Sequence, residues 1–366
     1  MRAPDRPRAE LRATVAALSV TVVFFLWLVL HIGGLTTVRY FDDIVTALAA
    51  LSACVACLLA ARRQSGAERR FWVLLGIALG AWTFAEVVWG VYDLVLNVAV
   101  PVPSWADVGY LGAIPLACAA LLCHPGMRAA GSYKTRATLD GLAIGASLLL
   151  LSWMFVLGPL WRGTDLSTFG GVVAIAYPFG DLVMVFLVIL SVRSITATGR
   201  KPLLWVLLGL FAMAVSDSTY AYLVEVGRYA TGNVIDTGWV LAYLAIAVGA
   251  TSDGGLTVRI SSREVAEASM VSFVTPYVPV LLALSSITVE LELHHRVDRV
   301  SWLVGFGLAL LVIARQALTL IDRRHELFSA RPESARPPSQ SPGPPRLQED
   351  NVLEAAPFPP FMRRTQ

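Results

Sequence analysis

Charged residues are scarce in this chain: Asp, Glu, Lys and Arg make up 15% of its 366 residues, and only two are lysines. Soluble domains usually carry about a quarter of their residues as charged side chains. Hydrophobic residues account for 56% of the chain. This composition excludes an ordinary soluble protein, and the net charge of +3 provides no basic surface for nucleic acid. We therefore expect an integral membrane protein without a nucleic-acid partner.

Cysteine and histidine are also rare, with four and five residues. Cys54 and Cys57 form a C-x-x-C pair, but no second pair or histidine stands at ligand spacing from it. We interpret the four cysteines as small packing residues of apolar helices. The sequence also lacks a Ser-His-Asp set and a phosphate-binding glycine loop. We expect no enzymatic activity, no metal site and no cofactor.

Long runs of apolar residues are the main feature of the sequence. A bilayer core of about 30 Å takes about 20 apolar residues per helix, and such runs predict an all-α, polytopic transmembrane bundle of about ten helices. Two prolines in the ninth run are compatible with a helix inside a bundle. The predicted helices are 13–34, 43–61, 71–95, 105–124, 138–160, 171–192, 202–225, 236–251, 271–289 and 300–320.

Basic residues alternate from one connection to the next. Four arginines lie in the segment 1–12, and the even-numbered connections carry more Arg and Lys than the odd-numbered ones. The positive-inside rule then places both termini in the cytoplasm of a multi-pass plasma-membrane protein. The first apolar run is long for a cleaved signal peptide, and no small-residue cleavage site follows it, so we interpret it as a retained anchor.

The composition changes sharply at the C-terminal end. Residues 327–366 are rich in proline and poor in apolar side chains. Such a segment cannot bury enough apolar surface to fold. The sequence predicts a disordered cytosolic tail.

Two stretches of the chain resemble two others. The segment "WVLLGIALG" from Trp72 matches "WVLLGLFAM" from Trp205, and "DVGY" from Asp107 matches "DTGW" from Asp236 in the pattern Asp-x-Gly-aromatic. A duplicated four-helix unit explains both matches, and an even number of helices makes the copies parallel. The predicted segments are two leading helices over 13–61, a first repeat over 70–192, and a second repeat with a cytosolic helix extension over 202–326.

Five carboxylates fall within or at the mouths of the predicted helices. Glu86 lies about fifteen residues into its helix, roughly 22 Å of rise, and Asp217 lies at nearly the same depth. Asp181 falls near mid-membrane, while Asp107 and Asp236 begin helices on the outer side. A charge at a helix centre costs about 2.5–3.5 kcal/mol on insertion scales, so such residues usually face the bundle interior or a wet cavity. We predict that the five converge on one outward-facing cavity.

Aromatic residues accompany these carboxylates, and two interpretations stay open for each kind of residue. The aromatic residues suit a ligand cavity, but also an interfacial belt or bundle packing. Asp107 and Asp236 suit the cavity, but also helix N-capping. The candidate ligand-cavity residues are Glu86, Asp107, Asp181, Asp217, Asp236, Trp89, Tyr177 and Tyr220.

Five short segments are informative because of the order in which they occur along the chain. They are "PSWADVGYL" at 103–111, "AYPFGDL" at 176–182, "SDSTYAY" at 216–222, "DTGW" at 236–239 and "ARQALTLIDRRHELF" at 314–328. This succession resembles the multi-helix N-terminal membrane region of actinobacterial GGDEF and GGDEF–EAL proteins, the cyclic-di-GMP synthases and hydrolases. The likeness covers about residues 70 to 326. It implies a sensory or regulatory module whose last helix leads to a cytosolic catalytic domain.

The sequence departs from that family where a catalytic domain would stand. It contains no D-x-L-T-G-L-x-N-R segment, no G-G-[DE]-E-F turn and no E-A-L motif. The resemblance therefore implies a receptor-like module without its own cyclase or phosphodiesterase output. Its expected partners are the bilayer, a small-molecule ligand, and either a cytosolic signalling protein or a second copy joined through the last helix. The alternative is a transporter of a small solute or ion, which repeats and intramembrane carboxylates also favour.

Overall fold

The computed structural model describes residues 6–124, 134–193, 200–252, 277–294 and 298–329. Within these ranges every regular element is a helix, so the predicted all-α fold is confirmed. Ten helical segments result when the turns that continue α3 and α6 are counted with them. Their bounds are α1 (Arg6–Leu30), α2 (Leu35–Arg62), α3 (Gly66–Gly90) with the π-helical turn η2 (Val91–Val95), α4 (Trp105–Cys123), α6 (Lys134–Ser152) with η4 (Trp153–Leu157) and α7 (Gly158–Gly163), α8 (Phe169–Arg193), α9 (Arg200–Glu225), α10 (Asp236–Thr251), α12 (Tyr277–His294) and α13 (Arg299–Ser329).

The helices have the length and surface of membrane spans. Eight helices of the described part of the chain are long and apolar enough to cross a membrane, and α10 is a shorter apolar helix of 16 residues. Large apolar side chains point outward from them, among them Leu303 at 73% exposed and Phe306 at 66%. An apolar surface of this kind is costly in water and favourable in lipid. The chain is a multi-pass membrane protein.

The first two helices differ from their predicted bounds. The prediction gave 13–34 and 43–61, whereas α1 ends at Leu30 and α2 begins at Leu35. Gly33 and Gly34 lie between them with φ of +85° and +84°. L-residues with a side chain rarely adopt these values, so the two glycines provide the reversal.

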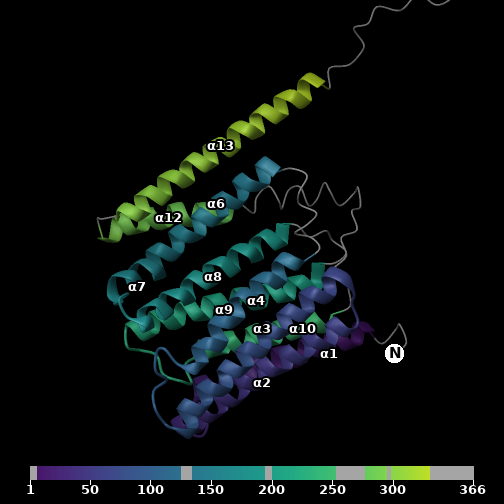
Figure 1. The fold of residues 1–366 in the computed structure, drawn as a ribbon, viewed down its shortest axis with the longest axis vertical. Coiled ribbons are helices and arrows are strands. Elements are labelled where there is room, and N and C mark those ends of the chain that lie inside the picture. The colour runs from purple at the N-terminus through teal and green to yellow at the C-terminus, as the bar shows by residue number, and fades with distance from the viewer. Residues whose placement is uncertain (1–5, 125–133, 194–199, 253–276, 295–297, 330–366) are drawn as a thin grey trace, which may run out of the picture. The chain divides into compact units, whose positions relative to one another are not determined.

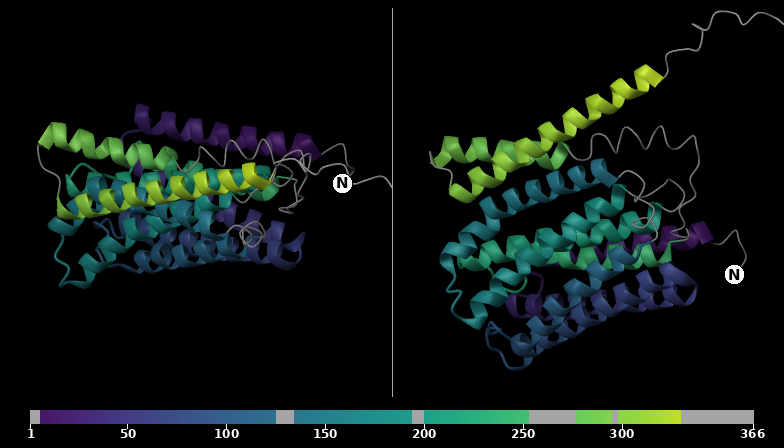
Figure 2. Two further views of the ribbon diagram at one scale, coloured as in Figure 1. Left: turned by 90° about the horizontal axis from the view of Figure 1, so that it is seen from above. Right: turned by 45° about the horizontal axis from the view of Figure 1, so that its top comes forward.

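The helices of residues 1–318 run alongside one another (Figures 1 and 2) and pack around two clusters. The larger cluster joins α1, α2, α3, α4, α8, α9 and α10, with Phe24, Leu75 and Leu210 fully buried in it. The smaller cluster joins α6, α12 and α13 through residues such as Leu150 and Leu308. Residues 319–366 form a second unit, of which the structure describes only the end of α13, up to Ser329.

Two glycines of the predicted repeats occupy equivalent packing positions. A Cβ on Gly109 of α4 would stand 2.6 Å from the carbonyl oxygen of Ala81 on α3. A Cβ on Gly238 of α10 would overlap Oγ of Ser216 on α9. Both glycines belong to the Asp-x-Gly-aromatic pattern, and both allow the second helix of a pair to approach the first closely. The duplication itself stays a prediction.

Several predicted segments lie outside the described residues. They include the first five residues, the first part of the predicted helix 271–289, and the predicted tail 327–366 apart from its first three positions, which end α13.

Candidate functional site

A cavity of about 330 Å³ lies between α2, α3, α4, α8, α9 and α10. This volume is within the usual range of small-molecule sites, about 300–1,000 Å³. Pro101 of the α3–α4 connection and Thr164 after α7 line it as well, so it reaches the end of the bundle where those connections lie. The polar and aromatic lining residues are Asp42, Asp43, Thr46, Trp82, Glu86, Trp89, Ser104, Asp107, Tyr110, Thr164, Tyr177, Asp217, Tyr220, Tyr229, Trp239 and Tyr243.

The structure brings most of the sequence-predicted candidates to this one cavity. Asp181 and Asp236 do not line it. Asp181 is instead buried beside the lining carboxyl group of Asp217, and Asp236 lies beside that of Asp42, with which it shares the backbone N–H of Gly232. The six candidates that line the cavity are Glu86, Trp89, Asp107, Tyr177, Asp217 and Tyr220.

Glu86 and Asp217 hold corresponding places in the two helix pairs. On α3, Glu86 has Tyr110 of α4 as a neighbour. On α9, Asp217 accepts a hydrogen bond of 2.6 Å from Nε1 of Trp239 on α10. Tyr110 and Trp239 are the aromatic residues of the two Asp-x-Gly-aromatic segments. The pattern therefore places an aromatic residue against the acid of the preceding helix in both pairs.

Asp107 fulfils both interpretations that the sequence left open. Its Oδ2 accepts the backbone N–H of Ser104 at 2.5 Å, which completes a capping box at the start of α4. Its Oδ1 accepts the hydroxyl of Tyr177 from α8 at 2.5 Å. The same carboxylate begins a helix and forms part of the cavity wall.

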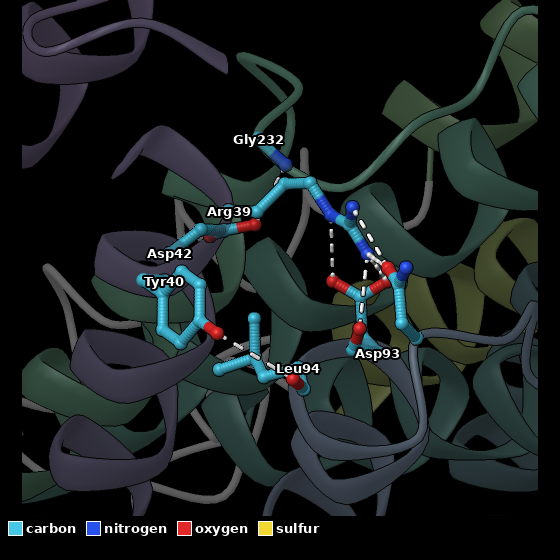
Figure 3. Close-up of polar contacts among 7 residues, drawn as sticks. Arg39, Tyr40, Asp42, Asp93, Leu94 and Gly232 are labelled. Atoms are coloured by element: carbon cyan, nitrogen blue, oxygen red, sulfur yellow. Dashed lines mark hydrogen bonds and ion pairs between the residues drawn. The ribbon is translucent and has the colours of Figure 1, made fainter. Parts of the chain in front are cut away.

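Asp236 takes a different role from the N-cap that its position suggested. The N-cap residue of α10 is Ile235, and it makes no side-chain cap. Asp236 instead accepts the backbone N–H of Gly232 at 3.0 Å, and Asp42 accepts the same N–H at 2.8 Å. Figure 3 shows this approach of Asp42 to Gly232. The shared N–H of Gly232 therefore holds the carboxyl groups of Asp42 and Asp236 side by side between α2 and α10.

Tyr229, in the α9–α10 connection, is hydrogen-bonded to the Asp236 member of the Asp42–Asp236 pair. Its hydroxyl donates to Oδ1 of Asp236 at 3.3 Å. Burial, together with the nearby carboxyl groups of Asp236 and Asp42, raises the pKa of Tyr229 well above its ordinary value. The phenol therefore stays protonated and available as a donor at physiological pH.

Asp43, Asp93 and Arg39 form a second polar group, of which only Asp43 lines the cavity. Arg39 donates to both carboxylate oxygens of Asp93, at 2.6 and 3.1 Å, in a forked arrangement that Figure 3 shows. The π-helical turn η2 carries Asp93, and such turns often occur at functional sites. Asp43 is a further neighbour of Asp93. The guanidinium of Arg39 is thus engaged by Asp93 and does not line the cavity.

Three side-chain oxygens of α2, from residues that line the cavity, are buried and have no hydrogen-bond partner in the described part of the chain. They are Oδ1 of Asp42, Oδ2 of Asp43 and Oγ1 of Thr46. Their residues are 4%, 8% and 4% exposed, respectively. An unsatisfied buried polar group costs about 1–3 kcal/mol. This part of the cavity wall therefore holds hydrogen-bonding atoms that the described part of the chain leaves unused.

Aromatic rings form another part of the cavity wall. The ring of Tyr220 packs edge to face against three rings, with centroid distances of 4.6 Å to Tyr229, 5.8 Å to Trp239 and 6.2 Å to Trp89. All four rings line the cavity. They offer apolar surface and π faces to whatever occupies it.

Sequence reasoning missed the contribution of α2 and of Tyr243. Asp42 and Asp43 stood just before or at the start of a predicted helix outside the repeat, where carboxylates are usually solvated. Tyr243 is a lone tyrosine in an apolar helix, which is typical of packing. A helical projection of α2 would have placed Asp42, Asp43 and Thr46 on one side, because residues three and four apart share a face.

The cysteines of α2 have packing roles. The thiol of Cys54 donates to the carbonyl oxygen of Gly76 on α3 at 3.2 Å, and Cys57 is fully buried. No group of three or more His, Cys, Asp or Glu residues in the described ranges is arranged to hold a metal ion.

Comparisons of the chain with protein-family models, with curated proteins and with solved structures found no match.

Proposed function

We propose that the chain is a receptor-like membrane module that binds a small molecule in the cavity and transmits the binding through helix packing. The observation that carries this proposal is the origin of the cavity wall, which six long helices and the short α7 share. A ligand that contacts six helices favours the packing in which those contacts are best, and this difference in affinity is what shifts a conformational equilibrium. The proposal includes no catalytic step by the chain itself.

The contacts that lead from the cavity to α13 support a route for the signal. Tyr177 of the cavity wall and Phe186 both lie on α8, and the ring of Phe186 lies over Gly145 of α6, where an added Cβ would stand 3.4 Å from it. On α6, Asp140 forms a buried ion pair with Arg315 of α13. A displacement of α8 would thus reach the last helix through α6.

The resemblance described above supports the same role. In the family of cyclic-di-GMP synthases and hydrolases, the corresponding last helix leads to the catalytic domain. We propose that here α13 acts on a separate cytosolic signalling protein or on a second copy of the chain. We propose that the protein is located in the cell membrane, with both termini in the cytoplasm.

A transporter is the second candidate, because carboxyl groups inside a membrane bundle are common on solute and ion pathways. The two candidates differ in access. A transporter must expose its cavity to each side of the membrane in turn, whereas a receptor cavity is reached from one side only.

Cysteine labelling from each side tests the proposal without knowledge of the ligand. In a chain whose four cysteines are replaced, Ala221→Cys places a thiol in the cavity wall. Val98→Cys and Ser65→Cys, both at exposed positions, mark the two ends of the bundle. A membrane-impermeant maleimide is applied to right-side-out and to inside-out vesicles. We expect Ala221→Cys to react only from the side on which Val98→Cys reacts.

Reaction of Ala221→Cys from both sides contradicts the receptor proposal and favours transport. Absence of reaction from either side, with both marker positions labelled, means that solvent does not reach the cavity, and this also contradicts the proposal.

A further inference from the structure

The charge of the cavity wall restricts what the cavity can bind. Five carboxyl groups line it, and no Lys, Arg or His residue does. The five are Asp42, Asp43, Glu86, Asp107 and Asp217. Anions in a low-dielectric cavity are stable only with protons or cations beside them.

The donors that the protein supplies to these groups are neutral. Glu86 accepts from the hydroxyl of Tyr243 at 2.8 Å, Asp217 from the indole of Trp239, and Asp107 from Tyr177 and Ser104. These hydrogen bonds satisfy oxygen atoms but neutralise no charge. The guanidinium of Arg39 interacts with the charge of Asp43, but it is hydrogen-bonded to Asp93 and does not line the cavity. The lining residues themselves therefore supply no counter-cation.

The unpartnered oxygens of α2 indicate which kind of cation suits the cavity. Asp42, Asp43 and Thr46 each present an unpartnered oxygen while being at least nine-tenths buried. A carboxylate oxygen can only accept, and a hydroxyl can accept as well. Their partner must therefore carry several N–H or O–H donors, as a primary ammonium group does.

The remaining wall specifies the rest of the ligand. The cluster of Trp89, Tyr220, Tyr229 and Trp239 provides rings for an apolar or aromatic body, and most of the exposed surface of the cavity is apolar. A hydrated metal ion would leave this surface unused. The described residues also contain no group of three or more His, Cys, Asp or Glu arranged for a metal.

We propose that the cavity binds a primary amine with an apolar or aromatic body, its ammonium group hydrogen-bonded to Asp42, Asp43 and Thr46 and its body against the aromatic wall around Tyr220. This inference rests on the proposed function, since it names the ligand class of that same cavity. Charge attraction and hydrogen bonding act at one end, and apolar burial acts at the other.

Phenethylamine is a suitable probe because it combines a primary ammonium with a phenyl ring. Its isosteres separate the contributions: 2-phenylethanol lacks the charge, 3-phenylpropanoate reverses it, and trimethyl(2-phenylethyl)ammonium keeps the charge without N–H donors. The measurement is the unfolding midpoint of the full-length protein in nanodiscs, followed by tryptophan fluorescence. At saturation we expect phenethylamine to raise the midpoint by about 5 °C or more and the alcohol and the acid to leave it unchanged.

Variants locate the effect. Thr46→Val keeps the side-chain shape and removes the hydroxyl, Asp43→Asn removes the charge, and Tyr220→Leu removes the central ring. Each should weaken phenethylamine binding about tenfold or more. The matched controls are Asp165→Asn and Tyr222→Leu, an exposed acid and an exposed tyrosine that do not line the cavity, and these should bind as the unmodified chain does.

Equal shifts by phenethylamine and 2-phenylethanol would overturn the amine proposal, and so would undiminished binding by both Thr46→Val and Tyr220→Leu. A stronger effect of the trimethyl analogue than of the primary amine would overturn the hydrogen-bonding part. If the acid binds in the cavity and the amine does not, the inference fails while the receptor proposal stands. If the amine binds and enters the lumen of proteoliposomes, the inference stands and the receptor proposal fails.

Discussion

Tyr243 of α10 donates a hydrogen bond of 2.8 Å to Oε1 of Glu86 on α3, across 157 positions of sequence. The ring of Tyr243 is 1% exposed and lies 6.4 Å from the ring of Trp82, so the phenol reaches the carboxylate through the packed core. This bond joins the α3–α4 pair to the α9–α10 pair beside the cavity.

Replacement of Tyr243 by Phe should lower the free energy of unfolding by about 1–3 kcal/mol, because the ring packing stays and Glu86 loses one buried donor. Chemical denaturation in detergent measures the change. Tyr222→Phe is the matched control, since Tyr222 is 58% exposed and should tolerate the loss of its hydroxyl. Equal effects of the two variants would show that the bond to Glu86 contributes nothing.

Gly109→Ala should destabilise the protein by about 1–3 kcal/mol, because the new methyl group meets the backbone of α3. Gly112→Ala on the same helix meets no atom within 4 Å and should be neutral or slightly stabilising. Gly238→Ala should be destabilising alone but partly restored by Ser216→Ala, because its clash is with a side chain. A thermal-stability series of the four variants checks this order. Full tolerance of Gly109→Ala would contradict the close approach of α3 and α4.

Asp107→Asn should cost about 1 kcal/mol and Asp107→Ala about 2 kcal/mol or more. The amide retains one acceptor oxygen for two donors, Ser104 and Tyr177, whereas alanine retains none. Tyr177→Phe combined with Asp107→Asn should show less than the sum of the single losses, because both changes remove the same bond. Additive effects in this double-mutant cycle would mean that the two side chains act independently.

Arg315→Met should destabilise the bundle strongly, by about 3–5 kcal/mol, because it leaves the carboxylate of Asp140 without its cation inside the α6–α12–α13 cluster. The double variant Arg315→Met/Asp140→Leu should recover most of the loss, since it removes both charges. Unfolding in detergent compares the three proteins. A double variant as unstable as Arg315→Met alone would mean that the pair has a role other than mutual compensation.

The stability of the protein should depend on pH through Asp298, which lies just before α13. Its partial burial raises the pKa, but hydrogen bonds from Ser301 and Trp153 and the charge of Arg162 outweigh it, so the pKa of Asp298 lies below its ordinary value. The folded state therefore binds this proton less readily than the unfolded state does. The stabilisation is complete above the ordinary Asp pKa of about 4 and is lost as pH falls through the lower folded-state pKa.

Unfolding midpoints of the unmodified chain and of Asp298→Asn, compared between about pH 6 and pH 3, check this direction. The advantage of the unmodified chain should shrink toward low pH. Trp153→Phe, which removes one donor to Asp298, should show a smaller pH dependence than the unmodified chain. An advantage that stays constant with pH would contradict the role of the charged carboxylate.

The sequence predicted the helices well because each apolar run is long enough to leave no other structure in a membrane. The bounds 236–251 coincide with those of α10, where Asp236 precedes the run and polar residues follow Thr251. The first reversal was misplaced, because it depends on the backbone conformation of Gly33 and Gly34 rather than on the polarity that marked Asp42 and Asp43.

The cavity was only partly predictable for a related reason. Depth along a helix follows from counting residues, so Glu86 and Asp217 could be placed at a common level. Rotation about the helix axis and the choice of neighbouring helices do not follow from counting. The sequence therefore could not predict that Asp236 lies beside Asp42 or that Tyr243 is hydrogen-bonded to Glu86.

The close contacts at Gly109 and Gly238 have a mechanical consequence for the cavity. In each pair, α3 with α4 and α9 with α10, the second helix lies so close to the first that there is no room for a methyl group at the glycine. The cavity can then widen or narrow only if one pair moves as a stiff body against the other. The Tyr243–Glu86 hydrogen bond and the contact between the rings of Tyr243 and Trp82 both join the two pairs, so both oppose such a movement.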